Sequence, residues 1–385
     1  MKRKIVSAFC VFVLLLSLAG CFSSYRDVPS DVGRQEYDVT EYRTTMKYYE
    51  DFKILQIADL HLGIETDLSK QLEILRDKIS TEKPDLIILT GDNFMYATKG
   101  IVENLVKTLN EECQKLSEAN GERITKFAIT FGNHDNQGDY PRYFINDVIK
   151  SYTAKDGEEI REGKYAAFVD FEDDNLFGLT NYYIDLVDDR EKSLDTVDVK
   201  YRIHIIDSNT YHFMGADYDY DVIHTEQLDH AVNIYDNATK DKDYIGMAFF
   251  HIPFHEYQEA WNQYNSSENK SEIGQGEFRE DVLYPYEDNG TYEKLREANI
   301  ISFFCGHDHI NYGDFIYNAE SEKIDDKAIF SYGVKSTNQL YHDTDMIGYK
   351  TITLEREMTK EEFISIENIK ENFINVTGGY SVYED

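Results

Sequence analysis

Short apolar runs alternate with longer amphipathic stretches through the first part of the chain. Apolar residues predominate over 52–58, 86–89 and 126–130, which predicts three strands. Between these runs, apolar residues recur every three or four positions over 68–79 and 101–119, a spacing typical of helices that bury one face. Alternation of this kind predicts βαβ units in which helices cover a sheet.

The middle of the chain changes to successive strands separated by acidic turns. We expect strands over 164–170, 176–186 and 201–207, in a more antiparallel arrangement. A helix is expected over 225–238, and a further strand over 245–250.

Residues 256–290 are polar and rich in Asn, Glu and Gly, so we expect a long insertion there. Loops near a site often shape it, which makes Tyr257 and Trp261 candidates for substrate contact. Ordinary loop packing is the more common role for such residues. The remaining predicted strands close the fold and cover 300–304, 328–332 and 349–354.

The N-terminus has the layout of a signal peptide. A basic start precedes an apolar stretch over 5–18, which is short for a membrane span. The stretch ends in Leu-Ala-Gly before Cys21 and resembles the lipobox of bacterial lipoproteins, in which the cysteine is lipidated. A plain signal peptide or an uncleaved anchor is the alternative. We therefore expect removal of residues 1–20, a lipid on Cys21 that binds the membrane, and an extracytoplasmic location.

Composition suggests how the rest of the chain is organised. Residues 21–48 are polar and mixed, which predicts a lipidated cysteine and a tether. A single large domain is expected over 49–357, and residues 358–385 would pack on it or trail from it. Outside the signal region only Cys113 and Cys305 are left, so one pair could form but no disulfide framework is implied.

The net charge of the chain restricts which molecules it can bind. The 385 residues include 39 Lys and Arg against 73 Asp and Glu, a net charge of −34. Such a surface repels nucleic acid and anionic membranes, so a long polyanion is an unfavourable substrate.

Five short polar segments each follow a predicted strand. Their carboxylate and amide oxygens together with imidazoles suit Mn, Fe, Zn or Co better than Ca, and the absence of thiolates argues against a structural zinc. In an extended chain, residues i and i+2 point the same way, so Asp59 and His61 can reach one ion together, as can His307 and His309. The segments are Asp59-Leu60-His61, Gly91-Asp92-Asn93, Gly132-Asn133-His134-Asp135, His251 and Gly306-His307-Asp308-His309.

Glycine precedes the polar residues of three segments, at Gly91, Gly132 and Gly306. Because glycine has no Cβ, we expect each of them to let the backbone turn sharply as it leaves its strand.

Taken in order from about residue 50 to residue 340, these segments resemble the signature of the calcineurin-like metallophosphoesterase superfamily, D-x-H, GD-x, GNH-[DE], a lone His and GH-x-H. The sequences at 56–61 and 248–253 resemble those of the branch that contains the Dcr2-type and purple-acid-phosphatase-29-like proteins. The resemblance implies an α/β fold, a β-sandwich flanked by helices in four αββα layers.

The resemblance also implies a role for each motif residue. Two transition-metal ions, Mn, Fe or Zn, would lie about 3.5–4 Å apart, lower the pKa of a bridging water and polarise the phosphoryl oxygens. His134 would protonate the leaving oxygen, and Asp135 would orient and charge its imidazole. The first ion would be bound by Asp59, His61, Asp92 and His309, and the second by Asp92, Asn133, His251 and His307.

Departures from related signatures distinguish this chain from two classes of phosphatase in the superfamily. The arginine that phosphoprotein phosphatases of this superfamily carry soon after GD is missing here. Met95 stands where purple acid phosphatases place a tyrosine ligand, and Tyr96 comes one position later. Asn93 and Asn136 could contact phosphate instead, or could only shape their own turns.

We therefore expect a cell-surface, two-metal enzyme that hydrolyses small phosphomonoesters or phosphodiesters. A non-catalytic, metal-containing binding lipoprotein is one alternative. A secreted nuclease is the other, which the negative charge disfavours. The sequence leaves open which ester is cut, which metals bind and what the oligomeric state is.

Overall fold

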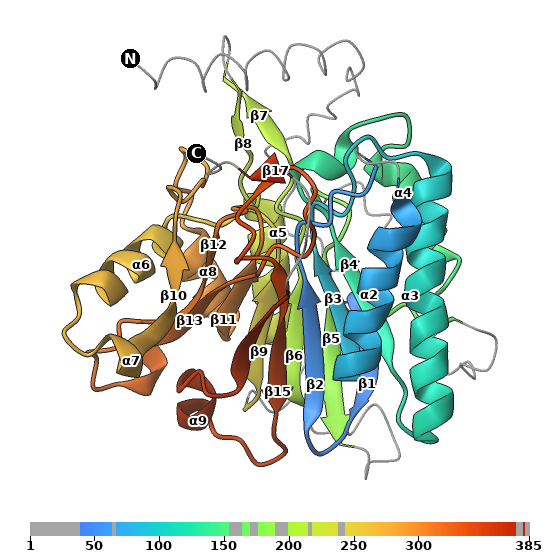
Figure 1. Ribbon diagram of the computed structural model, residues 1–385. Coiled ribbons are helices and arrows are strands. Elements are labelled where there is room, and N and C mark those ends of the chain that lie inside the picture. Colours follow the sequence, from blue (N-terminus) through green and yellow to red (C-terminus); the bar gives the residue numbers. More distant parts are fainter. Residues whose placement is uncertain are drawn as a thin grey trace, which may run out of the picture.

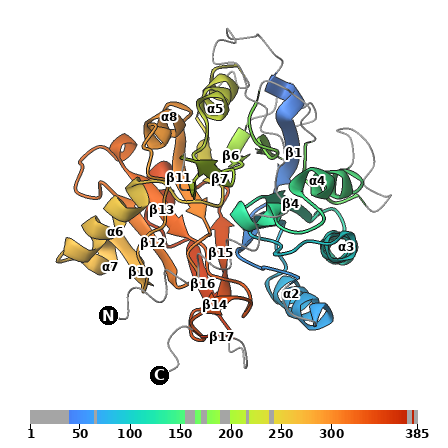
Figure 2. The same ribbon diagram turned by 90° about the horizontal axis from the view of Figure 1, so that it is seen from above.

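Two β-sheets pack face to face, and helices cover both outer faces (Figure 1; Figure 2). This arrangement confirms the predicted α/β fold with αββα layers. The computed structural model describes residues 39–63, 67–153, 164–169, 176–188, 199–214, 218–237, 243–374 and 380–381.

The five-stranded sheet carries the parallel core predicted from the first part of the chain. Strands β2, β3 and β4 are parallel neighbours, and β15 runs antiparallel to β2. Its strands, in order across the sheet, are β16 (Ile369–Phe373), β15 (Gly348–Leu354), β2 (Phe52–Ile57), β3 (Leu86–Thr90) and β4 (Lys126–Thr130).

Three helices cover the outer face of this sheet: α2 (Leu68–Glu82), α3 (Lys99–Asn120) and α4 (Arg142–Lys150). Helix α2 buries Leu72, Leu75 and Ile79, whose spacing places them on one face of the helix. The Asp67 side chain accepts a hydrogen bond from the Lys70 amide, and Thr98 caps α3 in the same way. The predicted helices over 68–79 and 101–119 are confirmed.

The eight-stranded sheet forms the other half of the sandwich. Met247 and Phe249 of β9 enter the core between the sheets, whereas Ala248 faces the outer helices, as the period of two requires. In order, its strands are β1 (Arg43–Tyr48), β5 (Tyr182–Asp188), β6 (Val199–Ile205), β9 (Ile245–Phe249), β11 (Ile300–Cys305), β13 (Ala328–Tyr332), β12 (Asn311–Tyr317) and β10 (Gly274–Phe278).

Its outer face packs against α5 (Thr225–Asn237), α6 (Glu256–Ser266) and α8 (Thr291–Glu297). The smaller elements are 3₁₀ turns at η1 (Val39–Tyr42), η2 (Asn133–Asn136) and η4 (Ile324–Asp326), helices α7 (Lys270–Ile273) and α9 (Lys360–Ile364), and strands β7 (Tyr211–Phe213), β8 (Tyr218–Tyr220), β14 (Tyr341–His342) and β17 (Tyr380–Ser381).

The prediction of a strand over 164–170 is wrong, because the described part of this segment, residues 164–169, forms no strand. Only Ala166 forms bridges, to Phe127 and Thr153. The amide of Tyr165 donates to the Asn110 side chain instead of a strand partner. The apolar run is therefore buried without forming a strand. The strand expected over 176–186 begins only at β5.

The expected insertion over 256–290 contains α6, α7 and β10. Tyr257 and Ala260 are buried three positions apart on α6, a helical spacing hidden among polar residues. Tyr257 lies in the outer core, and Trp261 stacks on Phe278 at 4.3 Å. The described contacts of both residues are packing contacts within the fold, which was the alternative to substrate contact.

Both ends of the folded body differ from the predicted boundaries. Strand β1 pairs in parallel with β5 along its whole length, so residues 43–48 belong to the sheet and not to a tether. Its alternate residues Thr44, Met46 and Tyr48 are buried, a period-two signal that the sequence interpretation missed. At the other end, α9 and β16 show that part of 358–385 packs on the domain.

In the part of the chain that the structure describes, no helix is long and apolar enough to cross a membrane. The predicted signal peptide and Cys21 lie outside the described residues. Cys113 and Cys305 are both buried and unpaired, so the possible disulfide between them is absent.

Candidate metal centre

The ends of β2, β3, β4, β9 and β11 meet at one edge of the sandwich, and the motif residues follow these ends. Ligand atoms of the first group all lie within 4.8 Å of one another, and the same holds for the second group. Asp92 belongs to both groups, as the resemblance implied. The first group is Asp59, His61, Asp92 and His309, and the second is Asp92, His251 and His307.

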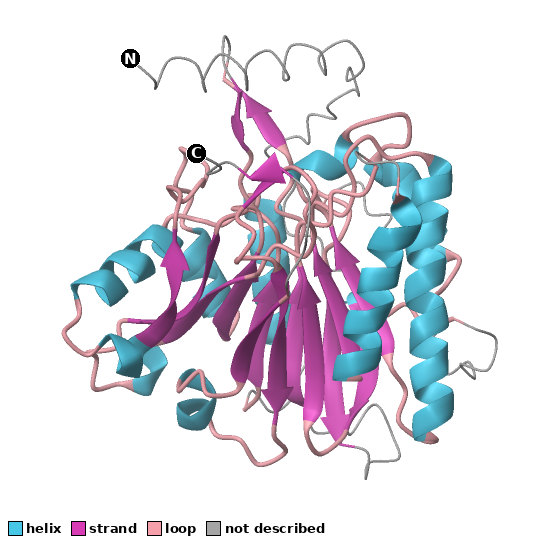
Figure 3. Cartoon of the chain, in the orientation of Figure 1, coloured by secondary structure: helices cyan, strands magenta, loops and turns pink. Residues whose placement is uncertain are grey.

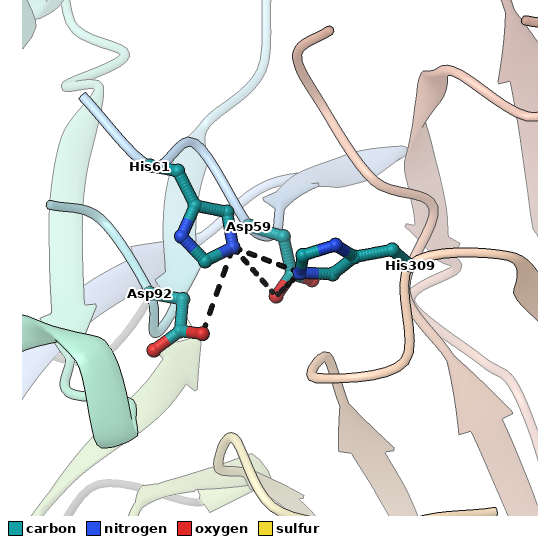
Figure 4. Close-up of side chains that lie close together, drawn as sticks. All are labelled: Asp59, His61, Asp92 and His309. Carbon is teal, nitrogen blue, oxygen red and sulfur yellow. Dashed lines mark hydrogen bonds and ion pairs between the residues drawn. The ribbon is translucent and has the colours of Figure 1, made fainter. Parts of the chain in front are cut away.

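Figure 4 shows how the first group converges. His61 Nε2 lies 2.9 Å from His309 Nε2 and 3.6 Å from Asp92 Oδ2. Asp59 Oδ1 lies 3.9 Å from His61 Nε2 and 3.8 Å from His309 Nε2. Such separations match the edges of a coordination shell in which each ligand lies about 2.1 Å from a metal.

The second group lies on the other side of Asp92. His251 Nε2 is 3.2 Å from Asp92 Oδ2 and 3.3 Å from His307 Nδ1. The Asn133 Nδ2 group donates to the Tyr211 hydroxyl at 2.7 Å, while its buried Oδ1 has no hydrogen-bond partner among the described residues. Leaving a buried oxygen unpaired is costly, so this amide oxygen fits a metal ligand.

Backbone carbonyls fix the tautomers of two histidines. His251 Nδ1 lies 2.9 Å from the Thr90 carbonyl oxygen, and His309 Nδ1 lies 2.9 Å from that of Tyr341. A carbonyl can only accept, so each Nδ1 carries a proton and each Nε2 is the ring nitrogen left to bind a metal.

Burial sets the charge of the centre. It lowers the pKa of His61, His307 and His309 well below the usual histidine range, so these imidazoles are neutral, the form that binds metal. Burial opposes ionisation of Asp92, but His251 and His134 hold its pKa well below the usual range. Although burial opposes its charge, Asp92 raises the pKa of His251 to about 9, so this imidazole must give up a proton to bind a metal. The other three imidazoles are already neutral ligands, which suit a transition-metal cation.

Several motif residues adopt left-handed backbone conformations. The φ angles are 55° at Asp59, 46° at His61, 48° at Asp92 and 85° at His307. The expected extended geometry is therefore wrong, although the side chains converge as predicted. The His61 amide donates to the Asp92 carbonyl at 2.8 Å, which ties the two turns together. Strained conformations of this kind persist where surrounding contacts impose them.

The three glycines serve two purposes. Gly91 has φ +89°, which confirms the expected turn. Gly132 has φ −112°, so no left-handed turn explains it. A Cβ there would overlap Asp92 Oδ1, and a Cβ at Gly306 would lie 2.9 Å from Asp59 Oδ2. Close approach of ligands therefore requires glycine at these two positions.

His134 lies at the open side of the centre. Its Nε2 is 4.0 Å from Asp92 Oδ2, and its side chain is 23% exposed, whereas the side chains of Asp92 and His61 are buried. Its amide donates to Asp92 Oδ1 at 2.8 Å. The imidazole can therefore reach solvent and a bound ester while its backbone is tied to the shared carboxylate.

Asp135 does not orient this imidazole. Its carboxylate accepts hydrogen bonds from the amides of Gly132 and Phe94, both at 2.8 Å, and from Asn93 Nδ2 at 3.0 Å. Within the described chain it makes no hydrogen bond to the His134 ring, whose buried Nδ1 has no partner there. Asp135 instead joins the loops that follow β3 and β4. Asn93 is buried, and its Nδ2 also donates to the Thr130 carbonyl at 2.9 Å, so it helps to hold the same loops together.

Four residues outside the motifs border the centre. Tyr220 meets the His307 ring edge-on at 4.5 Å, and Tyr341 stacks on His309 at 4.2 Å. The hydroxyl of Tyr211 bonds Asn133, as described above. Lys335 is buried, and its Nζ donates to the Asp59 carbonyl at 3.2 Å. These residues could not be predicted, because no motif or spacing in the sequence connects them to the ligands.

Known proteins are similar to this chain over most of its length. A family model described as calcineurin-like phosphoesterase matches residues 52–311. Phosphatase DCR2 of Saccharomyces cerevisiae is 26% identical over 303 residues, which cover 74% of this chain and 47% of that protein. The chain thus spans about half the length of that relative.

Two further proteins are similar over most of their length. Probable inactive purple acid phosphatase 29 of Arabidopsis thaliana is 25% identical over 338 residues, 80% of this chain and 78% of the relative. The crystal structure of a dimetal phosphatase from Danio rerio superposes with a TM-score of 0.43 at 12% identity, covering 80% of this chain and 94% of that one.

Proposed function

The chain belongs to the calcineurin-like phosphoesterase family and is a metal-dependent hydrolase, and we propose that it hydrolyses small phosphomonoesters or phosphodiesters outside the cytoplasm. The Dcr2-type and purple-acid-phosphatase-like relatives place it in the predicted branch.

One observation carries the proposal, namely that Asp92 is shared by the two groups of candidate ligands. Bound there, two ions such as Mn, Fe or Zn would polarise the phosphoryl oxygens and lower the pKa of a water. In the proposal, Asp59, His61 and His309 complete the first site, while Asn133, His251 and His307 complete the second.

The proposed role of His134 is to donate a proton to the leaving oxygen. The side chain is partly exposed beside Asp92, and its ring lies 5.2 Å from that of His61. An imidazole can both hold and release a proton, which suits this role. Asp135 would act only as a positioning residue, because it holds the loop that carries His134.

Charge and the N-terminal pattern support the substrate size and the location. A net charge of −34 opposes binding of a long polyanion, while a cluster of bound cations would attract one phosphate locally. In the proposal, a lipid on Cys21 holds the enzyme at the outer face of the cell membrane.

Turnover of a panel of chromogenic phosphomonoesters and phosphodiesters by metal-reconstituted protein tests the function. We expect Asp92→Asn to lose both metal and activity. His134→Ala should keep its metal but lose about 10²–10⁴-fold in kcat, the usual range for a general acid. His255→Ala is the matched control, because that imidazole bonds the Pro285 carbonyl and should leave turnover unchanged.

Equal activity of wild type and His134→Ala would contradict the assigned proton donor. Failure of the metal-loaded wild type on every ester would instead favour a non-catalytic binding lipoprotein. The Arabidopsis relative is itself named a probable inactive phosphatase, which agrees with that reading. Against that reading, all seven expected ligand positions hold competent residues, namely Asp59, His61, Asp92, Asn133, His251, His307 and His309.

A further inference from the structure

A short hairpin of β7 and β8 rises above the strand ends that carry the metal centre (Figure 1; Figure 3). Tyr211 pairs across the strands with Tyr220, and Phe213 pairs with Tyr218. Alternate strand residues share a face, so these four rings form one aromatic face. The ring centroids lie 5.6 Å apart in the first pair and 5.1 Å apart in the second.

The inner pair of this aromatic face reaches the candidate ligands. The Tyr211 hydroxyl accepts from Asn133 Nδ2 at 2.7 Å, and the Tyr220 ring lies edge-on to His307 at 4.5 Å. The outer pair is open, with Phe213 53% and Tyr218 49% exposed. The face therefore continues from the metal centre out to solvent.

The opposite face of the hairpin is polar and anchored. Asp219 accepts a hydrogen bond from the Tyr286 amide at 2.6 Å, while His212, its cross-strand neighbour, is exposed. This anchor leaves the outer aromatic pair available at the rim of the site.

We propose that the aromatic face binds the alcohol part of the substrate by stacking on a planar aromatic ring. The substrates would then be phosphate monoesters of nucleoside size, such as nucleoside monophosphates. Residues i and i+2 of a strand lie about 7 Å apart, so the outer pair stands about one sugar's length beyond the inner pair. The inference rests on the proposed function, since the phosphate must lie at the metal centre.

The chemistry of this face favours a ring over other occupants. A flat base gains from stacking on one exposed aromatic face, and Tyr hydroxyls tolerate water around it. An acyl chain gains mainly by removal from water, which a half-exposed hairpin does not provide. A long nucleic acid would meet the net charge of −34. A single nucleotide gains from stacking without complete burial, and it carries far fewer charges than a long nucleic acid.

The test compares adenosine 5′-monophosphate with ribose 5-phosphate, using the full chain reconstituted with Mn²⁺. In both esters, the bond from phosphorus to the same primary alcohol oxygen breaks. Water supplies the new oxygen of the phosphate, and the leaving oxygen takes up a proton. Because the reaction is the same, a difference in kcat/KM reports the base alone. We expect wild type to prefer the nucleotide by about tenfold, the usual effect of one stacking contact.

In the double variant Phe213→Ala/Tyr218→Ala, this preference should fall to about one, because kcat/KM for the nucleotide loses about tenfold. Both side chains are exposed, and thermal unfolding will check that the fold is intact. Phe213→Tyr keeps the ring and should keep the preference. His212→Ala, on the polar face, is the matched control and should also keep it.

Equal kcat/KM of wild type for both esters would overturn the inference and leave the proposed function standing. Preference for hexyl phosphate over the nucleotide would also overturn it, in favour of an acyl-chain surface. No turnover of these esters or of the chromogenic panel would overturn the proposed function, and the inference with it.

Discussion

Several individual residues of the metal centre are strained or closely packed. Asp59, His61, Asp92 and His307 hold left-handed conformations, each of which costs about 1–3 kcal/mol for a residue with a side chain. Gly132 lies so close to Asp92 that no side chain fits between them. The fold itself therefore imposes the positions of these ligands.

Replacement of Gly132 by alanine tests this packing. The new Cβ would overlap Asp92 Oδ1 and lie 2.6 Å from His251 Cδ2, so Asp92 must move. We expect a loss of bound metal and a fall of at least about tenfold in kcat/KM, since one ångström of misplacement can cost about 10²-fold.

The matched control is Gly100→Ala, because nothing lies within 4 Å of a Cβ at that position in α3. It should keep metal and activity, and it should raise stability by about 0.5–1 kcal/mol. Full metal content and activity in Gly132→Ala would contradict the assigned role of this glycine.

At the level of elements, the centre lies across the two sheets. Its first residues follow β2, β3 and β4 of the five-stranded sheet, and its last histidines follow β9 and β11 of the eight-stranded sheet. Buried Lys350 of β15 joins the sheets, since its Nζ lies 2.7 Å from Asp314 Oδ1 of β12 and 2.9 Å from Ser331 Oγ of β13. This ion pair helps to keep the two sets of ligands aligned.

Replacement of Lys350 by methionine should destabilise the protein by about 3–5 kcal/mol, because it leaves the Asp314 carboxylate buried without its partner. Urea denaturation measures this free energy of unfolding. Replacement of both residues, Lys350→Met/Asp314→Leu, should recover most of the loss.

The exposed Lys370 on neighbouring β16 provides the control, and Lys370→Met should change stability by less than about 0.5 kcal/mol. A loss below about 1 kcal/mol in Lys350→Met would show that the buried pair does not hold the sheets together.

Several of these elements were predictable and others were not. Strand-end ligands followed from motif order, because parallel strands end at one edge of a sheet. The hairpin of β7 and β8 was hidden, since its strands are short and its contact with Asn133 and His307 is purely tertiary. The role of Asp135 was also hidden, because residue type and spacing do not reveal which loop a carboxylate faces.

In the whole molecule, a strongly acidic surface surrounds a centre built to bind cations. The net charge of −34 would repel phosphate esters, and bound metal would reverse this repulsion locally. The alternation of strands and helices predicted a sheet covered by helices, whereas the four layers of the sandwich were implied by the family resemblance. Which ester enters the site depends on surface loops and the hairpin, for which no sequence rule exists.

Anomalous diffraction from crystals of the Mn²⁺-loaded protein, measured near the metal absorption edge, locates the bound ions directly. We predict two peaks about 3.5–4 Å apart on either side of Asp92. One should lie among Asp59, His61 and His309, and the other near His251 and His307. A single peak, or a pair of peaks away from Asp92, would contradict the two-metal centre.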